Sequence, residues 1–153
     1  MPDLDAIYVP IGLGSGICGA ISARDALGSK ADVVGVVAEN ASAYALSYDA
    51  GKPIATNSAD TFADGLAVRI PDSRALEVIL AGAARVGTVS EQEMRSAVRY
   101  YYTDTHNLAE GAGAASLAAL MQEKEVMVGR KVGLVLSGGN IDRDLYLDIL
   151  ADG

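Results

Sequence analysis

The chain has 153 residues and half of them are hydrophobic, so it is long enough to fold around a buried core as one domain or a large part of one. Twelve lysines and arginines stand against twenty aspartates and glutamates, and the net charge of −8 argues against a nucleic-acid-binding protein and against docking on anionic membranes. The single cysteine, Cys18, excludes an internal disulfide and favours a reducing, cytoplasmic location.

No segment has the character of a membrane span or a secretion signal. The longest uncharged stretch covers residues 6–23, but Pro10 and four glycines interrupt it, and a spanning helix would break there. Residues 1–5 contain no basic side chain, which the start of a signal peptide requires. The sequence therefore predicts no membrane partner.

Strands and helices are predicted to alternate along the chain. Apolar runs and helical spacing predict, in chain order, a strand at 5–10, a helix at 17–27, a strand at 33–38, helices at 41–50, 76–84, 90–102 and 113–123, a strand at 131–136 and a helix at 141–150. Gly28 and Gly51 are predicted to end two helices, residues 56–64 form a loop, and Ser90 with Glu93 forms a capping box. This alternation predicts an α/β three-layer sandwich with a mainly parallel sheet, in which ligands bind beyond the carboxyl ends of the strands.

The loop after the first predicted strand has the pattern of an anion-binding turn. Gly14, Gly16 and Gly19 satisfy G-x-G-x-x-G between a strand and a helix, where backbone N–H groups and the helix dipole favour a phosphate. Glu39 ends the next strand, where a dinucleotide-binding fold has its ribose-binding acid. The loop is therefore typical of a nicotinamide or flavin enzyme. The alternative is a tight turn whose glycines only let the helix pack on the strand.

A second glycine loop follows the last predicted strand. Residues 137–140 read Ser-Gly-Gly-Asn, which a dinucleotide site does not require. A cofactor with a phosphate at one end and a ring nitrogen at the other would use both loops, because the Ser137 hydroxyl can hydrogen-bond a neutral pyridine nitrogen. The alternative is an ordinary glycine turn at a strand end.

Four ordered motifs resemble one enzyme family. They are VPIGLGSG at 9–16, TFADG at 61–65, AEGAGA at 109–114 and SGGN at 137–140. Together they are similar to the threonine dehydratase and serine racemase family, the fold-type II enzymes that use pyridoxal 5′-phosphate. The resemblance runs from residue 5 to about residue 150 and implies that the chain is part of the larger domain of such an enzyme.

The resemblance implies the residues that contact the cofactor. The first loop would wrap the phosphate, Ser137 would meet the pyridine nitrogen, and Gly65 and Glu110 would lie near the cofactor. Leu13 and Ser15 replace glycines that the family often has, although their backbone N–H groups can still serve. The implied cofactor-binding residues are Gly12, Leu13, Gly14, Ser15, Gly16, Gly65, Glu110 and Ser137.

Some members of the family bind a divalent cation after the second strand. By resemblance, Glu39 would be the first carboxylate ligand and Ala43 would supply a backbone carbonyl. The position of the second carboxylate is occupied by Ala45, so the chain has one carboxylate fewer for a hard cation that prefers several oxygens.

The family's Schiff-base lysine is not matched by any residue of this chain. The four lysines, Lys30, Lys52, Lys124 and Lys131, lie outside any Ser-x-Lys-x-Arg motif and are interpreted as surface residues. We therefore expect residues 1–153 to be the C-terminal portion of the catalytic domain, with the N-terminal half as a partner, and we expect no activity from this chain alone. The resemblance also implies a homo-oligomer.

Three functional hypotheses follow from these observations. The leading one is a pyridoxal-phosphate-dependent ammonia-lyase that deaminates a β-hydroxy amino acid, a small amino-acid substrate, to a 2-oxo acid. The second is an NAD(P)-dependent oxidoreductase built on Gly14, Gly16, Gly19 and Glu39. The third is a non-catalytic fragment that binds or stabilises a partner chain. His106, the only histidine, is interpreted as a helix-end residue.

Overall fold

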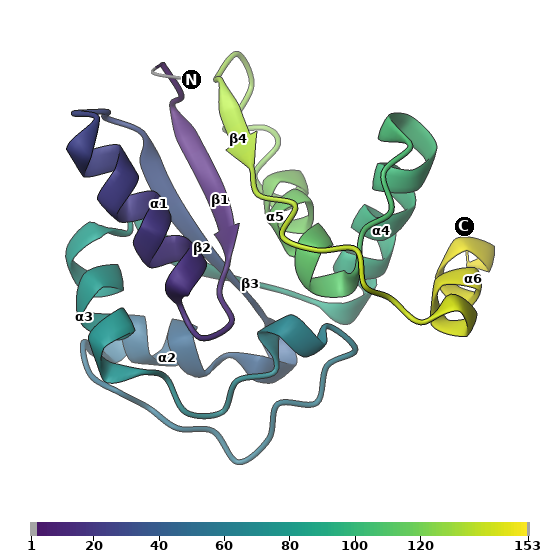
Figure 1. Cartoon of the computed structure of the whole chain (residues 1–153), viewed down its shortest axis with the longest axis horizontal. Coiled ribbons are helices and arrows are strands. Elements are labelled where there is room, and N and C mark those ends of the chain that lie inside the picture. The colour runs from purple at the N-terminus through teal and green to yellow at the C-terminus, as the bar shows by residue number, and fades with distance from the viewer. Residues whose placement is uncertain (1–2, 153) are drawn as a thin grey trace.

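A four-stranded parallel sheet lies between two layers of helices in the computed structural model, which describes residues 3–152 (Figure 1). The strands are β1 (Ala6–Pro10), β2 (Asp32–Ala38), β3 (Arg85–Val89) and β4 (Val132–Leu134), in the spatial order β3-β2-β1-β4. Every pairing among them is parallel. The predicted three-layer α/β fold with a mainly parallel sheet is confirmed.

Helices cover both faces of the sheet (Figure 1). One side carries α1 (Ser15–Ala26), α2 (Ala43–Ala50) and α3 (Ser73–Gly82), and the other carries α4 (Glu91–Thr105) and α5 (Gly111–Gln122), with α6 (Arg143–Ala151) packed on α4. Two short 3-10 turns, Glu39–Ala41 and Asp64–Leu66, lie in the connections. None of these helices between residues 3 and 152 combines the length and the apolar character that crossing a bilayer requires.

Helix boundaries differ from the predicted ones where a cap decides them. The helix expected at 17–27 begins at Ser15, because Gly14 takes a left-handed conformation (φ 98°) and serves as its N-cap. The helix expected at 76–84 runs over 73–82, because the Asp72 carboxylate accepts the Ala75 N–H at 2.9 Å and starts it earlier. The last strand ends at Leu134, two residues before the predicted end.

Strand β3 was not predicted. Its five residues, Arg-Val-Gly-Thr-Val, include a charge and a glycine, and only Val89 is fully buried. A strand at the edge of a sheet needs less apolar surface than a central one, so its sequence carries a weaker signal. The segment pairs with β2 over its whole length, and tertiary pairing therefore decides its structure.

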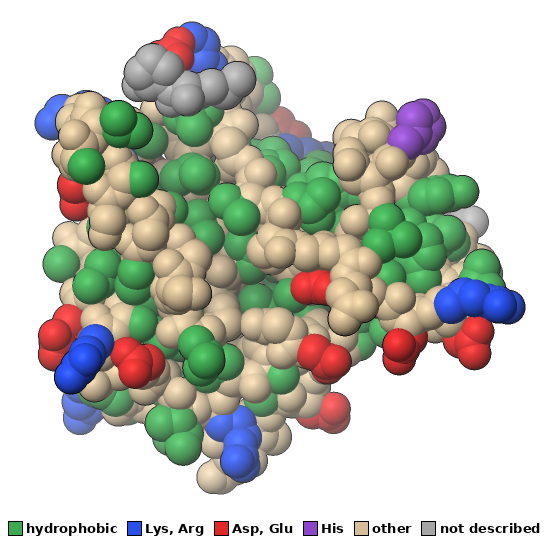
Figure 2. Space-filling model, in the orientation of Figure 1, with side chains coloured by type: hydrophobic (Ala, Val, Ile, Leu, Met, Phe, Trp, Pro, Cys, Tyr) green, Lys and Arg blue, Asp and Glu red, His purple; other side chains and the backbone are tan. Residues whose placement is uncertain are grey.

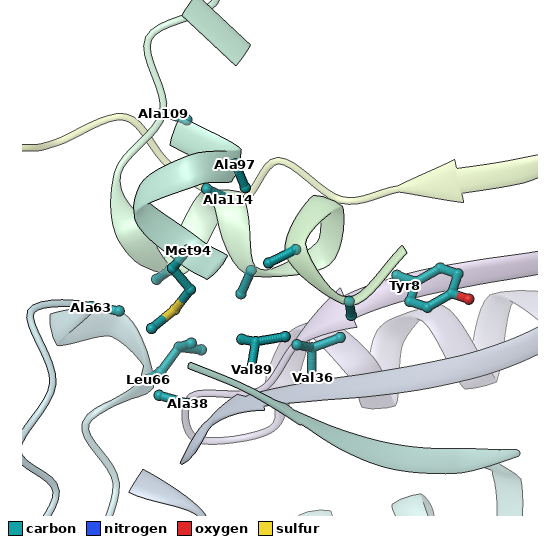
Figure 3. Close-up of a cluster of buried hydrophobic side chains, with 14 of the residues drawn as sticks. Tyr8, Val36, Ala38, Ala63, Leu66, Val89, Met94, Ala97, Ala109 and Ala114 are labelled. Atoms are coloured by element: carbon teal, nitrogen blue, oxygen red, sulfur yellow. The ribbon is translucent and has the colours of Figure 1, made fainter. Parts of the chain in front are cut away.

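The two faces of the sheet bury separate apolar clusters. Alternate residues of β2 divide between them: Val33 and Val37 face α1 to α3, whereas Val34 and Val36 face α4 and α5. Figure 3 shows part of the second cluster, where Met94 of α4 points toward the sheet. Each fully buried large apolar side chain contributes about 1.5–3 kcal/mol, so the two clusters hold the layers together.

A polar network closes the amino end of the sheet on the α5 side. The Tyr8 hydroxyl donates to the Glu123 carboxylate, and Arg85 donates to the same carboxylate from Nε at 2.9 Å and to the Tyr8 hydroxyl at 3.2 Å. Burial, with the adjacent Glu123 carboxylate, raises the pKa of Tyr8 to about 12. Burial pushes the pKa of Glu123 upward, but the hydrogen bonds from Arg85 and Tyr8 outweigh it, and the net pKa is lowered. The network ties β1, β3 and the end of α5 together.

Charged side chains are spread over the face of the molecule seen in Figure 2. On the face seen in Figure 2, lysines and arginines lie singly around the periphery and do not form a continuous basic patch. This distribution agrees with the low basic content of the chain.

The capping box at Ser90 is expected to stabilise α4. The Ser90 hydroxyl accepts the Glu93 N–H at 3.3 Å, and the Glu93 carboxylate accepts the Ser90 N–H at 2.7 Å. We expect Ser90→Ala to lower the free energy of unfolding by about 1 kcal/mol in urea denaturation. The control is Ser96→Ala, inside the same helix, which we expect to change it by less than about 0.5 kcal/mol. Equal losses in the two variants would contradict a capping role.

Glu123 is expected to make stability depend on pH on the acid side. Because the folded pKa lies below the ordinary value of 4.5, the stabilisation is complete above that value and is lost as pH falls through the folded pKa. We expect the difference in unfolding free energy between the wild type and Glu123→Gln to shrink from about pH 6 to about pH 3. Glu125→Gln, at an exposed position, is the control, and a difference independent of pH would refute the assignment.

Candidate functional site

A cavity of about 360 Å³ opens at the carboxyl end of β1, where the two predicted glycine loops meet. It brings together all eight residues implied as cofactor contacts: Gly12, Leu13, Gly14, Ser15, Gly16, Gly65, Glu110 and Ser137. Pro10, Leu66 and Ala112 also line it. Sequence reasoning assigned none of these three to the cofactor, although Pro10 and Ala112 lie inside quoted motifs and Leu66 directly follows one.

The first loop lines this cavity, and most of its backbone N–H groups have no acceptor within residues 3–152. Ile11 N–H donates to the Val36 carbonyl at 2.8 Å, and Cys18 N–H donates to the Gly14 carbonyl at 3.0 Å. Between these two residues, no backbone N–H of 12–17 donates to any other group within residues 3–152. The N-terminus of α1 adds the positive end of its dipole at the same place. The arrangement is suited to an anion.

Close backbone approach fixes the two loops that meet at the cavity. A Cβ atom at position 12 would lie 2.4 Å from the Gly65 carbonyl oxygen, which no side chain tolerates. On the α5 side, a Cβ atom at position 113 would lie 2.3 Å from the Gly138 carbonyl oxygen. Glycine at these two positions lets the loops after β1 and β4 close on their neighbours.

Glu110 joins the N-terminus of α5 to the Ser-Gly-Gly-Asn loop. Its carboxylate accepts the Asn140 N–H at 2.9 Å, and its own N–H donates to the Gly138 carbonyl at 3.1 Å. The same residue lines a neighbouring cavity of about 320 Å³ together with Asp64 and Asp142. Glu110 therefore fixes the second loop and lies at the boundary of both cavities.

Ser137 is exposed, follows β4 by three residues and lines the cavity. The structure thus places the Gly14 loop and Ser137 around one space, as the use of both loops by a single cofactor requires. A neutral hydroxyl at this position can donate to, or accept from, a ring atom of a bound molecule.

The region of the predicted cation lies apart from this cavity. Glu39 is exposed in the turn after β2 and lines a separate cavity of about 400 Å³ that also contains Asp60, whereas Ala43 and Ala45 are buried in α2. Within residues 3–152, no three histidine, cysteine, aspartate or glutamate side chains gather as a metal site. A cation at Glu39 and Ala43 stays a prediction.

The remaining reactive side chains have structural surroundings. The Cys18 thiol donates to the Ala75 carbonyl at 3.6 Å, and burial raises the pKa of this thiol, which opposes thiolate formation. His106 is exposed at the C-terminal end of α4, in agreement with its interpretation as a helix-end residue. The four lysines are exposed, and none lines the cavity.

The contacts of the glycines distinguish the cavity from a dinucleotide site. The strand order β3-β2-β1-β4 is compatible with both kinds of site. In the dinucleotide fingerprint, however, the third glycine serves close packing of the helix on the strand. Here a Cβ atom at Gly19 would meet nothing within 4 Å. In the part of the chain that the structure describes, Gly19 therefore does not serve close packing of the helix on the strand.

Alanine substitutions are expected to separate the two kinds of helical glycine. Gly19→Ala fills open space in α1, and we expect it to raise the free energy of unfolding by up to about 1 kcal/mol. Gly113→Ala in α5 meets the Gly138 carbonyl, and we expect it to lower that free energy by about 1–3 kcal/mol. Urea denaturation measures both, and a stabilised Gly113→Ala variant would contradict the close approach of α5 to the second loop.

Comparisons with known proteins agree with the motifs. The family described as "Pyridoxal-phosphate dependent enzyme" matches residues 1–138. The chain is 32% identical to the L-threonine ammonia-lyase of Thermotoga maritima over 153 residues, which is 100% of this chain and 38% of that relative. The crystal structure of a threonine deaminase from T.th. is 31% identical with a TM-score of 0.84, covering 91% of this chain and 51% of that one. Maize serine racemase is 26% identical with a TM-score of 0.88, covering 99% and 47%.

The chain spans less than half the length of the curated relatives that it matches, between 33% and 46% for three of them. The family match nevertheless covers nine-tenths of this chain and includes both glycine loops up to residue 138. It favours the first of the three hypotheses over the oxidoreductase. The chain belongs to the pyridoxal-phosphate-dependent enzyme family, as the resemblance of its four motifs implied.

Proposed function

We propose that this chain forms the cofactor-binding part of a pyridoxal-phosphate-dependent ammonia-lyase that deaminates a β-hydroxy amino acid to a 2-oxo acid. The observation that carries the proposal is the run of N–H groups between residues 12 and 17, at the start of α1, that have no acceptor within residues 3–152. Membership of the family and the similarity to a threonine ammonia-lyase support it. Threonine ammonia-lyase is the activity named for that relative. We propose ammonia-lyase activity for the complete enzyme of which this chain would be part.

The residues around the cavity fit a pyridine ring that carries a phosphate. At position 12 the backbone approach excludes a side chain, so the phosphate end is bordered by peptide groups. At position 14 the left-handed conformation (φ 98°) is one that glycine adopts without strain. Neutral donors and a helix N-terminus at one end, with a serine hydroxyl at the other, match the two polar ends of the cofactor.

Each group of the chain has a distinct task in this proposal. The cofactor, when bound, supplies a conjugated system that accepts electrons from the substrate's α-carbon. The N–H groups of 12–16 bind its phosphate, and Ser137 hydrogen-bonds its ring nitrogen without placing a charge there. Glu110, fixed by the Asn140 N–H, holds the Ser137 loop against α5. A neutral ring nitrogen makes a milder electron acceptor and favours elimination over transamination.

The base and the groups that hold the substrate carboxylate are assigned to polypeptide other than these 153 residues. All four lysines lie beyond the ends of helices or before strands, away from the cavity: Lys30 precedes β2, Lys52 follows α2, Lys124 follows α5 and Lys131 precedes β4. The proposal therefore includes an N-terminal portion as partner and no ammonia release by this chain alone. A homo-oligomer and a cation at Glu39 stay predictions.

Binding of pyridoxine 5′-phosphate tests the proposal. This alcohol form of the cofactor lacks the aldehyde, so it cannot form imines with the four exposed lysines. We expect it to shift the backbone amide NMR signals of Gly12 to Gly16 and of Ser137, whereas pyridoxine without the phosphate leaves the glycine-loop signals unchanged. NAD binding that depends on Glu39 would contradict the proposal in favour of an oxidoreductase.

Ser137→Ala tests the ring contact. We expect the dissociation constant for pyridoxine 5′-phosphate to rise about fivefold, the loss of about one neutral hydrogen bond. Ser22→Ala, an exposed serine on α1 that does not line the cavity, is the matched control. Equal affinities for the two variants would remove Ser137 from the site and leave the phosphate loop as a separate assignment.

A further inference from the structure

A buried tyrosine hydroxyl connects the glycine loop to the helix behind it. Tyr44, on α2, is only 1% exposed. Its hydroxyl donates to the Leu13 carbonyl at 3.0 Å and accepts the Asp72 N–H at 3.0 Å. Burial raises the pKa of Tyr44, so the hydroxyl remains protonated and able to donate. Leu13 belongs to the first loop and Asp72 is the N-cap of α3, so one side chain joins two loops that are distant in sequence.

The loop has few other means of keeping its shape. The Leu13 side chain is 71% exposed, so it contributes little burial. The N–H groups on either side of Leu13 have no acceptor within residues 3–152. The peptide groups of the loop are therefore fixed from behind the cavity by the hydrogen bond from Tyr44 to the Leu13 carbonyl. The Leu13 carbonyl and the Gly14 N–H belong to one planar peptide unit. A hydrogen bond that fixes the carbonyl therefore also fixes the direction of this N–H.

Packing restricts the same place. A Cβ atom at position 14 would lie 2.6 Å from the Ala75 Cβ and 3.2 Å from the Tyr44 hydroxyl. The loop thus lies directly on Tyr44 and on the first turn of α3, and it cannot move toward them. The hydroxyl prevents movement in the opposite direction by holding the Leu13 carbonyl.

We propose that Tyr44 is a positioning residue that keeps the N–H groups of the first glycine loop directed toward the cofactor phosphate. The inference rests on the proposed function, since it assigns the loop to phosphate binding. Tyr44 lies behind the loop and does not line the cavity, so its effect on affinity is transmitted through Leu13. The sequence offers no signal for this role, because a tyrosine in an apolar helix is equally compatible with simple core packing.

The test compares two tyrosines on one helix. Tyr48, one turn after Tyr44, donates from its hydroxyl to the Ala83 carbonyl at 3.0 Å, at the other end of α3. We expect Tyr44→Phe to raise the dissociation constant for pyridoxine 5′-phosphate about tenfold, and Tyr48→Phe to change it by less than about twofold. Both variants lose a hydroxyl that donates to a backbone carbonyl, so a lower thermal midpoint in both is expected and does not distinguish them.

A measurement on the wild-type chain covers the case in which Tyr44→Phe does not fold. Binding at the loop and the hydrogen bond behind it must reinforce each other reciprocally. We expect pyridoxine 5′-phosphate to slow hydrogen exchange of the Asp72 amide, which donates to Tyr44. The control is the Ile54 amide, which donates at 2.8 Å to the hydroxyl of Ser47, a residue of α2 like Tyr44. The exchange rate of the Ile54 amide should not change.

The outcomes separate the two proposals. A wild-type chain that binds pyridoxine 5′-phosphate, with Tyr44→Phe and Tyr48→Phe equal in affinity, overturns the role of Tyr44 and leaves the proposed function standing. Equal exchange effects at Asp72 and Ile54 overturn it in the same way. A wild-type chain that binds no pyridoxine 5′-phosphate overturns the proposed function, and the role of Tyr44 falls with it.

Discussion

The approach of peptide backbones at the carboxyl edge of the sheet is the constraint on which the site depends. The loop after β1 lies against Gly65, and the N-terminal turn of α5 lies against Gly138, at distances that leave no room for a Cβ atom at positions 12 and 113. Four of the eleven residues that line the cavity are glycines, which offer only backbone atoms. Its shape is set by helix and strand packing, which is more rigid than the placement of long side chains.

The sheet topology makes this approach possible. Because β1 and β4 are adjacent and parallel, the loops that follow them emerge at the same edge, although they are more than a hundred residues apart in the chain. Helix α5 brings Glu110 between them, and its other end reaches the Tyr8, Arg85 and Glu123 network at the opposite end of the sheet. Helix α5 is therefore fixed at both ends: Glu110 hydrogen-bonds the second loop through its carboxylate and its N–H, and Glu123 binds Arg85 at the far end.

The sequence was informative where local chemistry decides structure. Continuous apolar runs identified β1 and β2, and Ser90 with Glu93 identified the start of α4. Strand β3 was missed because pairing with β2, and not its own composition, makes it a strand. The two glycine loops could be proposed as one site from the pattern of the strands. Gly65 and Glu110 came only from family resemblance, since neither lies in a distinctive local pattern. Tyr44 could not be found, because the partner of a buried hydroxyl is a property of three dimensions.

The composition of the cavity wall determines how a charged ligand would be recognised. Among residues 3–152, no lysine or arginine lines it and Glu110 is its one ionisable side chain, in a chain whose net charge is −8. An anion there would be bound by the N–H groups of the loop and the dipole of α1, while the negative net charge of the chain would repel it from a distance. Mobile ions screen that distant repulsion while leaving short N–H contacts intact. Capture of a phosphate by this chain would thus be favoured by moderate ionic strength, the reverse of what a pocket of basic side chains shows.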